Sequence, residues 1–197
     1  MNIKIQPMGE YQTNCYIVTI DEKDIIIDPG VNSLSWIVQN TNNPIAILNT
    51  HGHFDHIWDN KKLQEELNIK IYCPIGDAFM LENDPFRKGH PKCTPDFQIK
   101  PDEDIILEGI KVKFHHFPGH TIGCSAIEIE DSLFSGDFIF KGSIGRVDFP
   151  YANSHDMILS IKKILQWEKD INIYPGHGDS TSLQQERNSL NRWLNYL

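Results

Sequence analysis

Short apolar runs alternate with stretches of helical periodicity along the chain. The runs typical of strands cover residues 3–8, 14–20, 23–28, 45–48, 70–73, 105–107, 111–117, 125–130, 132–138 and 171–174. Acidic pairs at 21–22 and 130–131 predict tight hairpin turns between neighbouring runs. The alternation in 111–117 places Val112 and Phe114 on the core face of their strand. These patterns predict a protein rich in β-structure.

Four segments carry apolar residues at helical spacing, and they cover residues 33–38, 59–67, 154–168 and 182–197. Ser33, Asp59 and Ser182 are the predicted N-caps, the last in a capping box with Gln185. Between 78 and 101 the periodicity weakens, which predicts a long loop that is either a functional cover or a variable surface excursion. The order of strands and helices predicts an α/β architecture in which two sheets pack face to face with helices outside.

Length and charge narrow the function classes. With 197 residues, the chain suits one domain spanning 1–197, or two tightly fused halves, with a sizeable core. A formal net charge of −9 and a pI of about 5.4 disfavour nucleic acid as a partner. No stretch has the apolar length of a signal peptide or a membrane span, so we expect a cytoplasmic protein with no membrane partner. The four cysteines form no C-x-x-C pair, which predicts reduced, buried thiols.

The densest cluster of candidate metal ligands lies in T-H-G-H-F-D-H, immediately after the apolar run at 45–48. His51, His53, Asp55 and His56 fall within six positions, and their place predicts a loop at a strand end. Imidazole and carboxylate groups suit zinc, iron or manganese, and clustering them is costly without a cation. The alternative interpretation is a set of solvated loop histidines beside a helix-capping aspartate.

Three further candidates each stand where an apolar strand ends in a turn that contains glycine. They are His120 in F-P-G-H, Asp137 in S-G-D-F and His177 in Y-P-G-H. Each alone is compatible with a turn residue, but seven potential ligands exceed the four of a tetrahedral zinc and suit two cations that share a carboxylate. The hypothesis assigns one cation to His51, His53 and His120, the other to Asp55, His56 and His177, and the bridging role to Asp137.

Such a pair of cations implies hydrolysis. It lowers the pKa of bound water enough to hold a hydroxide nucleophile near neutral pH, while one cation polarises a carbonyl or stabilises the tetrahedral intermediate. Asp55 is the predicted catalytic residue, because its carboxylate can also accept a proton or orient the hydroxide.

These motifs resemble those of the metallo-β-lactamase-fold hydrolases, and within them the glyoxalase II-like proteins, or hydroxyacylglutathione hydrolases. The matching motifs, in the family's order, are Asp28-Pro29-Gly30, Thr50 to His56, Gly119-His120-Thr121, Gly136-Asp137 and Pro175-Gly176-His177-Gly178. The resemblance implies a four-layer αβ/βα sandwich of two mixed sheets with helices outside. It also implies two divalent metal ions, zinc first and iron or manganese as alternatives. Asp28 is expected to be a buried residue that supports the ligand loop, or else a turn-capping carboxylate.

The resemblance further implies a small thioester, such as an S-acyl glutathione, as the substrate. Glyoxalase II contacts glutathione through basic residues of a C-terminal helical extension, whereas only twenty residues follow His177 here. Arg146 and Lys141 are therefore expected to bind the substrate, with solvated loop cations as the alternative.

Several other activities are compatible with the same ligands. An aspartate at 137, where many β-lactamases of the superfamily have cysteine, disfavours antibiotic hydrolysis. The alternatives are a lactone or phosphodiester hydrolase using the same two metals, and a mononuclear iron persulfide dioxygenase.

Overall fold

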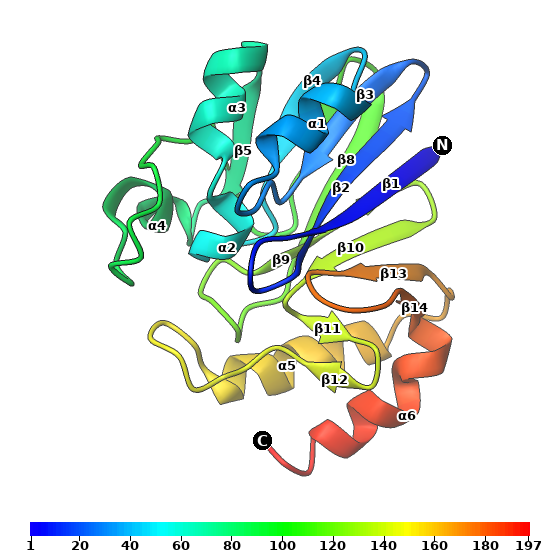
Figure 1. Ribbon diagram of the computed structural model, residues 1–197. Coiled ribbons are helices and arrows are strands. Elements are labelled where there is room, and N and C mark those ends of the chain that lie inside the picture. Colours follow the sequence, from blue (N-terminus) through cyan, green and yellow to red (C-terminus); the bar gives the residue numbers. More distant parts are fainter.

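Two mixed β-sheets packed face to face form the centre of the computed structural model, which describes residues 1–197 (Figure 1). The first sheet contains β1 (Asn2–Met8), β2 (Thr13–Ile20), β3 (Lys23–Ile27), β4 (Pro44–Leu48), β5 (Lys70–Pro74) and β6 (Phe97–Ile99) in that order. The second contains β14 (Thr181–Ser182), β13 (Asn172–Pro175), β10 (Ser132–Gly136), β9 (Ser125–Ile129), β8 (Ile110–His116) and β7 (Asp104–Leu107). A separate hairpin pairs β11 (Ile139–Phe140) with β12 (Ser143–Ile144).

The helices are α1 (Leu34–Asn40), α2 (Phe54–Ile57), α3 (Asn60–Leu67), α4 (Ala78–Asn83), α5 (Ser154–Leu165) and α6 (Leu183–Trp193). In the first sheet β1, β2 and β3 are antiparallel, and β3 to β6 are parallel. In the second, β7 to β10 are antiparallel, β13 runs parallel to β10, and β14 is antiparallel to β13. The predicted hairpin turns are confirmed, since Asp21, Glu22 and Glu130 adopt the left-handed conformation between paired strands.

Three apolar clusters separate the layers. The central cluster lies between the sheets and includes Ile25 and Leu48 from the first and Phe114 from the second. One outer cluster packs α1 and α3 against the first sheet, and the other packs α5 and α6 against the second. Figure 1 shows these helix pairs on opposite outer sides of the molecule. The predicted four-layer sandwich is therefore confirmed, and every sheet face has an apolar partner that excludes water.

Two of the predicted helix caps, Ser33 and Asp59, are confirmed in position, but neither side chain makes the capping hydrogen bond to its own helix. Ser33 occupies the N-cap position of α1, but its side chain makes no capping hydrogen bond. Instead the backbone N–H of Leu34 donates to Asp59 Oδ2 at 3.1 Å, so Asp59 caps α1 rather than α3, its own helix in sequence. Ser182 caps α6 as predicted, accepting from the backbone N–H of Gln185. The difference arises because a carboxylate can cap a helix distant in sequence when the fold brings the two together.

The segment at 78–101 is more ordered than its weak periodicity predicts. It contains α4, which has six residues, and β6, which has three. Both are too short to show a clear period, and Phe97 in β6 is exposed although it belongs to a strand. The short elements β11, β12 and β14 are missed for the same reason.

All four cysteines are buried and free, as predicted. None of the helices combines the length and the apolar character that crossing a bilayer requires.

Candidate metal centre

The seven candidate ligands meet at one edge of the sandwich, where strands of both sheets end. His51 and His53 follow β4, while His120, Asp137 and His177 follow β8, β10 and β13. The prediction that Asp55 and His56 lie on a loop is wrong. They lie in the one-turn helix α2, which has His53 at its N-cap position. Because α2 turns the chain immediately, these two side chains point into the same site as the loop histidines.

The ligand atoms form two groups of three. His51, His53 and His120 contribute one group, and Asp55, His56 and His177 the other, with the atoms of each group within 4.8 Å of one another. Within the first group, His53 Nδ1 lies 3.2 Å from His51 Nε2 and 2.8 Å from His120 Nε2. Ring nitrogens that converge so closely need a proton or a cation between them.

Asp137 lies between the two groups. Its Oδ1 is 3.3 Å from Nε2 of His56, and its Oδ2 is 3.4 Å from Nε2 of His120 and 3.5 Å from Nε2 of His177. The carboxylate therefore faces both groups at once. This is the arrangement that a shared ligand requires.

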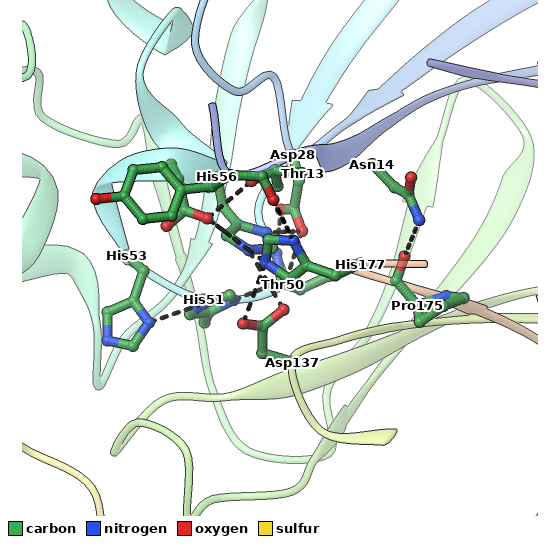
Figure 2. A network of polar contacts seen from close by, with 12 residues as sticks. Thr13, Asn14, Asp28, Thr50, His51, His53, His56, Asp137, Pro175 and His177 are labelled. Atoms are coloured by element: carbon green, nitrogen blue, oxygen red, sulfur yellow. Dashed lines mark hydrogen bonds and ion pairs between the residues drawn. The ribbon is translucent and has the colours of Figure 1, made fainter. Parts of the chain in front are cut away.

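Hydrogen bonds on the far side of the rings orient four of the histidines. Nδ1 of His56 lies 2.9 Å from Asp28 Oδ2, and Nδ1 of His51 lies 3.0 Å from the Thr50 hydroxyl. Figure 2 labels these four residues around the cluster of ligands. Nδ1 of His120 donates to the carbonyl of Arg146 at 2.8 Å, and Nδ1 of His177 to that of Tyr11 at 3.0 Å. These acceptors hold the N–H at Nδ1 and leave the Nε2 lone pair free for a metal.

Three buried atoms of the site lack a partner with hydrogen-bond geometry: His53 Nε2, His56 Nε2 and Asp137 Oδ1. A buried polar atom without a partner costs free energy, and such atoms are rare in folded proteins. Together with six imidazole and carboxylate ligands in two groups, these atoms fit divalent cations.

The electrostatics of the two groups differ. Burial lowers the pKa of His51 and His53, the latter to about 3, so both rings are neutral and keep a lone pair. Burial alone would also lower the pKa of His56, but the carboxylates of Asp137, Asp55 and Asp28 outweigh it and raise that pKa. Burial raises the pKa of Asp137, yet His56 and its neighbours hold it well below its ordinary value. The second group thus has enough negative charge to stabilise a positive charge.

Asp28 connects Thr50, at the start of the segment 50–56, to His56 at its end. It is buried and accepts from the backbone N–H of Thr50 at 2.8 Å, from the Thr50 hydroxyl at 2.6 Å and from His56. Through Thr50 it also reaches His51. Asp28 is therefore a supporting residue rather than an isolated turn cap.

Comparison with known proteins decides the family. The family model described as the metallo-beta-lactamase superfamily matches residues 8–177, a span that contains all seven candidate ligands. The chain belongs to the metallo-beta-lactamase superfamily. Membership, together with the histidine and aspartate groups, supports a metal-dependent hydrolase.

Similar proteins span almost the whole length of this superfamily member. Hydroxyacylglutathione hydrolase GloC of Haemophilus influenzae is 37% identical over 99% of both chains. The crystal structure of BLEG-1 B3 metallo-beta-lactamase is 30% identical, with a TM-score of 0.87, over 95% of this chain and 97% of that one. The crystal structure of TTHA1623 in a di-iron-bound form is 31% identical, with a TM-score of 0.80, over 94% of this chain and 98% of that one.

A cavity of about 530 Å³ opens onto the ligands of this superfamily member. His53, Asp55, His120, Asp137 and His177 line its floor. Its other lining residues are aromatic or basic: Tyr11, Phe54, Phe86, Lys88, Phe140, Arg146 and Phe149. The cavity therefore has the candidate metal ligands on one side and a largely aromatic wall on the other, and this wall carries two basic side chains, Lys88 and Arg146.

The two basic residues predicted to bind the substrate, Arg146 and Lys141, differ in their position relative to the cavity. Arg146 lines the cavity, where its guanidinium lies 4.2 Å from the centre of the Phe149 ring and pairs with both oxygens of Asp148. Lys141 does not line the cavity and instead lies 3.1 Å from Asp179 in a neighbouring exposed hollow.

Two supporting residues were missed from the sequence. Asp77 is buried and accepts from the backbone N–H of Gly52, the hydroxyl of Thr121 and the backbone N–H of Gly123, so it joins the two loops that carry the first ligand group. The hydroxyl of Thr13 donates to Asp55 Oδ2 at 2.7 Å. Neither residue stands in a motif, and their roles depend on contacts between distant segments.

Proposed function

We propose that the chain is a hydrolase that binds two divalent cations, zinc first and iron or manganese as alternatives, and cleaves small thioesters such as S-acyl glutathiones. The observation that carries the proposal is the position of Asp137, whose two carboxylate oxygens face different ligand groups. The similarity to GloC, a hydroxyacylglutathione hydrolase, supports the substrate class. The similar protein TTHA1623 in its di-iron-bound form supports two cations.

The proposed ligand roles follow the two groups. His51, His53 and His120 hold one cation, Asp55, His56 and His177 hold the other, and Asp137 is shared. When bound, the cations supply an activated water and positive charge next to the acyl carbonyl oxygen. The chain itself orients the ligands through Asp28, Thr50 and the carbonyls that accept from the ring N–H groups.

Asp55 has the proposed catalytic role in addition to ligation. Its carboxylate lines the cavity, and Thr13 fixes one of its oxygens. A carboxylate held in this way can orient the attacking water and accept its proton. Breaking the C–S bond releases the acid and a thiolate, which takes up the proton held by Asp55 and leaves through the cavity along its aromatic lining.

The proposed substrate contacts are Arg146 and Lys141. Arg146 keeps Nη1 free, because Asp148 engages only Nε and Nη2. Lys141 would contact only the part of a long substrate that extends beyond the cavity, since it lies outside the lining.

The proposal is tested with metal-reconstituted protein assayed on S-lactoylglutathione, a lactone panel and bis-p-nitrophenyl phosphate, with metal analysis of the same sample. We expect the highest kcat/KM on the thioester and two metals per chain. A preference for a lactone or the phosphodiester would refute the substrate class. One iron per chain with oxygen uptake on a persulfide would refute the hydrolase itself.

A further inference from the structure

The turn formed by residues 84–90 contributes two side chains to the cavity, Phe86 and Lys88, that are not metal-ligand candidates. Asp84, at the C-terminal end of α4, adopts the left-handed conformation. Its carboxylate accepts from the backbone N–H of Lys88 at 2.9 Å and of Gly89 at 2.8 Å, and its carbonyl accepts from the N–H of Arg87. His90 is buried, and its Nδ1 lies 3.3 Å from Asp84. The 84–90 turn is therefore fixed by its own hydrogen bonds.

This geometry directs two side chains of the turn towards the metal ligands. The ring of Phe86 lies 5.0 Å from that of His53, centre to centre. The ammonium of Lys88 lies 5.0 Å from the centre of the Phe54 ring. Both residues line the cavity, so the turn forms one of its walls.

Of the two basic side chains that line the cavity, Lys88 is the one that forms no ion pair with a carboxylate. Arg146, the other cation of the lining, pairs with Asp148 through two hydrogen bonds. Lys88 has no carboxylate oxygen within 4.0 Å, and its ammonium faces only an aromatic ring. A cation–π contact leaves the N–H donors of the ammonium free for an anion.

We propose that Lys88 is the specificity-determining residue that binds a carboxylate of the substrate and selects anionic thioesters over neutral ones. The inference rests on the proposed thioesterase function and adds to it the charge of the substrate. The aromatic wall of Tyr11, Phe54, Phe86 and Phe149 covers the apolar part of the substrate, and Lys88 binds its charged end. Arg146 also lines that wall and keeps Nη1 free for the substrate, but its pairing with Asp148 makes its attraction for an anion weaker than that of Lys88.

The test compares two thioesters with the same acyl group in the metal-reconstituted full chain: S-lactoylglutathione, which is anionic, and S-lactoyl-N-acetylcysteamine, which is neutral. Lys88→Ala should raise KM for the anionic substrate about tenfold, with kcat unchanged, because a charge-assisted contact is lost. KM for the neutral substrate should stay within about twofold. Lys88→Glu should raise the anionic KM further, and Lys88→Arg should restore it.

Lys92→Ala is the matched control, because it removes the same charge from an exposed position on the same segment that does not line the cavity. It should leave both KM values unchanged. An equal effect of Lys88→Ala on both substrates, or no effect on either, would overturn the assignment.

A binding measurement separates failure of this inference from failure of the proposed function. Isothermal titration with S-benzylglutathione, an anionic thioether that cannot be hydrolysed, should give about tenfold weaker binding to Lys88→Glu than to the native chain. If neither thioester is hydrolysed but this difference appears, the thioesterase proposal fails and the anion site stands. If the native chain hydrolyses thioesters but binds the thioether no better than Lys88→Glu does, Lys88 has no such role.

Discussion

Asp28 and His56 are joined by a 2.9 Å hydrogen bond between a carboxylate oxygen and Nδ1, in a position from which the opposite ring nitrogen faces Asp137. The same carboxylate also holds both the N–H and the hydroxyl of Thr50. One buried side chain thus sets the orientation of His56 and, through Thr50, that of His51. Loss of the Asp28 carboxylate should therefore change the affinity of the site for metal.

Asp28→Ala should weaken metal binding about 10- to 100-fold, because an acceptor that orients a ligating histidine contributes about that much. Asp28→Asn keeps one acceptor oxygen and should have an intermediate effect. Competition with a chromogenic chelator measures the affinity, and far-ultraviolet circular dichroism checks the fold. Unchanged metal affinity in a folded Asp28→Ala protein would contradict the supporting role.

Asp137→Ala should remove the proposed shared ligand of the two groups. We expect one metal per chain to be lost and kcat to fall by more than about tenfold, which corresponds to about 1.4 kcal/mol in the barrier. Asp131→Ala, which removes an exposed carboxylate in the turn before β10, is the control and should keep both metals. Turnover within tenfold of the native rate would mean that Asp137 is not shared.

Gly176→Ala should damage the site without a change of charge. A Cβ at this position would lie 2.2 Å from Asp137 Oδ1 and 2.7 Å from His56 Cε1, so either the ligands or the backbone must move. We expect a loss of metal and of most activity, measured by metal analysis and turnover. Gly178→Ala is the matched control in the same turn, because a Cβ there meets nothing within 4 Å and costs only about 1 kcal/mol of backbone strain at φ +76°. Equal activity of the two variants would contradict the steric argument.

Asp24 should contribute to stability in a pH-dependent way. Burial raises its pKa, but hydrogen bonds from Thr19 and from the backbone N–H groups of Asn42 and Asn43 outweigh this and lower the pKa below its ordinary value. A group with a depressed folded pKa stabilises the protein above its unfolded pKa, about 4, and loses this contribution as the pH falls through the folded value.

Asp24→Asn should therefore lower the free energy of unfolding by about 1 kcal/mol at neutral pH, with a difference that shrinks below about pH 4. Urea denaturation of both metal-free proteins over a range of pH measures this difference, in which protonation of the metal ligands cancels because it is common to both proteins. A difference that does not change with pH would show that the charge of Asp24 is not responsible.

The sequence predicts the layers and the ligand candidates well, because both depend on local patterns. Strands ending in glycine turns place His120, Asp137 and His177 at one edge, and the structure brings them to the cluster at 51–56. Features that depend on distant contacts are not predictable in this way. Asp59 caps a helix that precedes it by some twenty-five residues, and Asp77 joins two ligand loops without belonging to a motif. Local spacing carries no information about either contact.

The division of ligands between the two halves of the chain has a consequence for biosynthesis. All three residues of the first group, His51, His53 and His120, are synthesised before His177, which follows β13 and completes the second group. In the proposed site, cations held by ligands from both halves would join the two sheets at this end of the sandwich without a covalent crosslink. Binding of both proposed cations would therefore require that β13, the last of the strands followed by a ligand, has packed against β10.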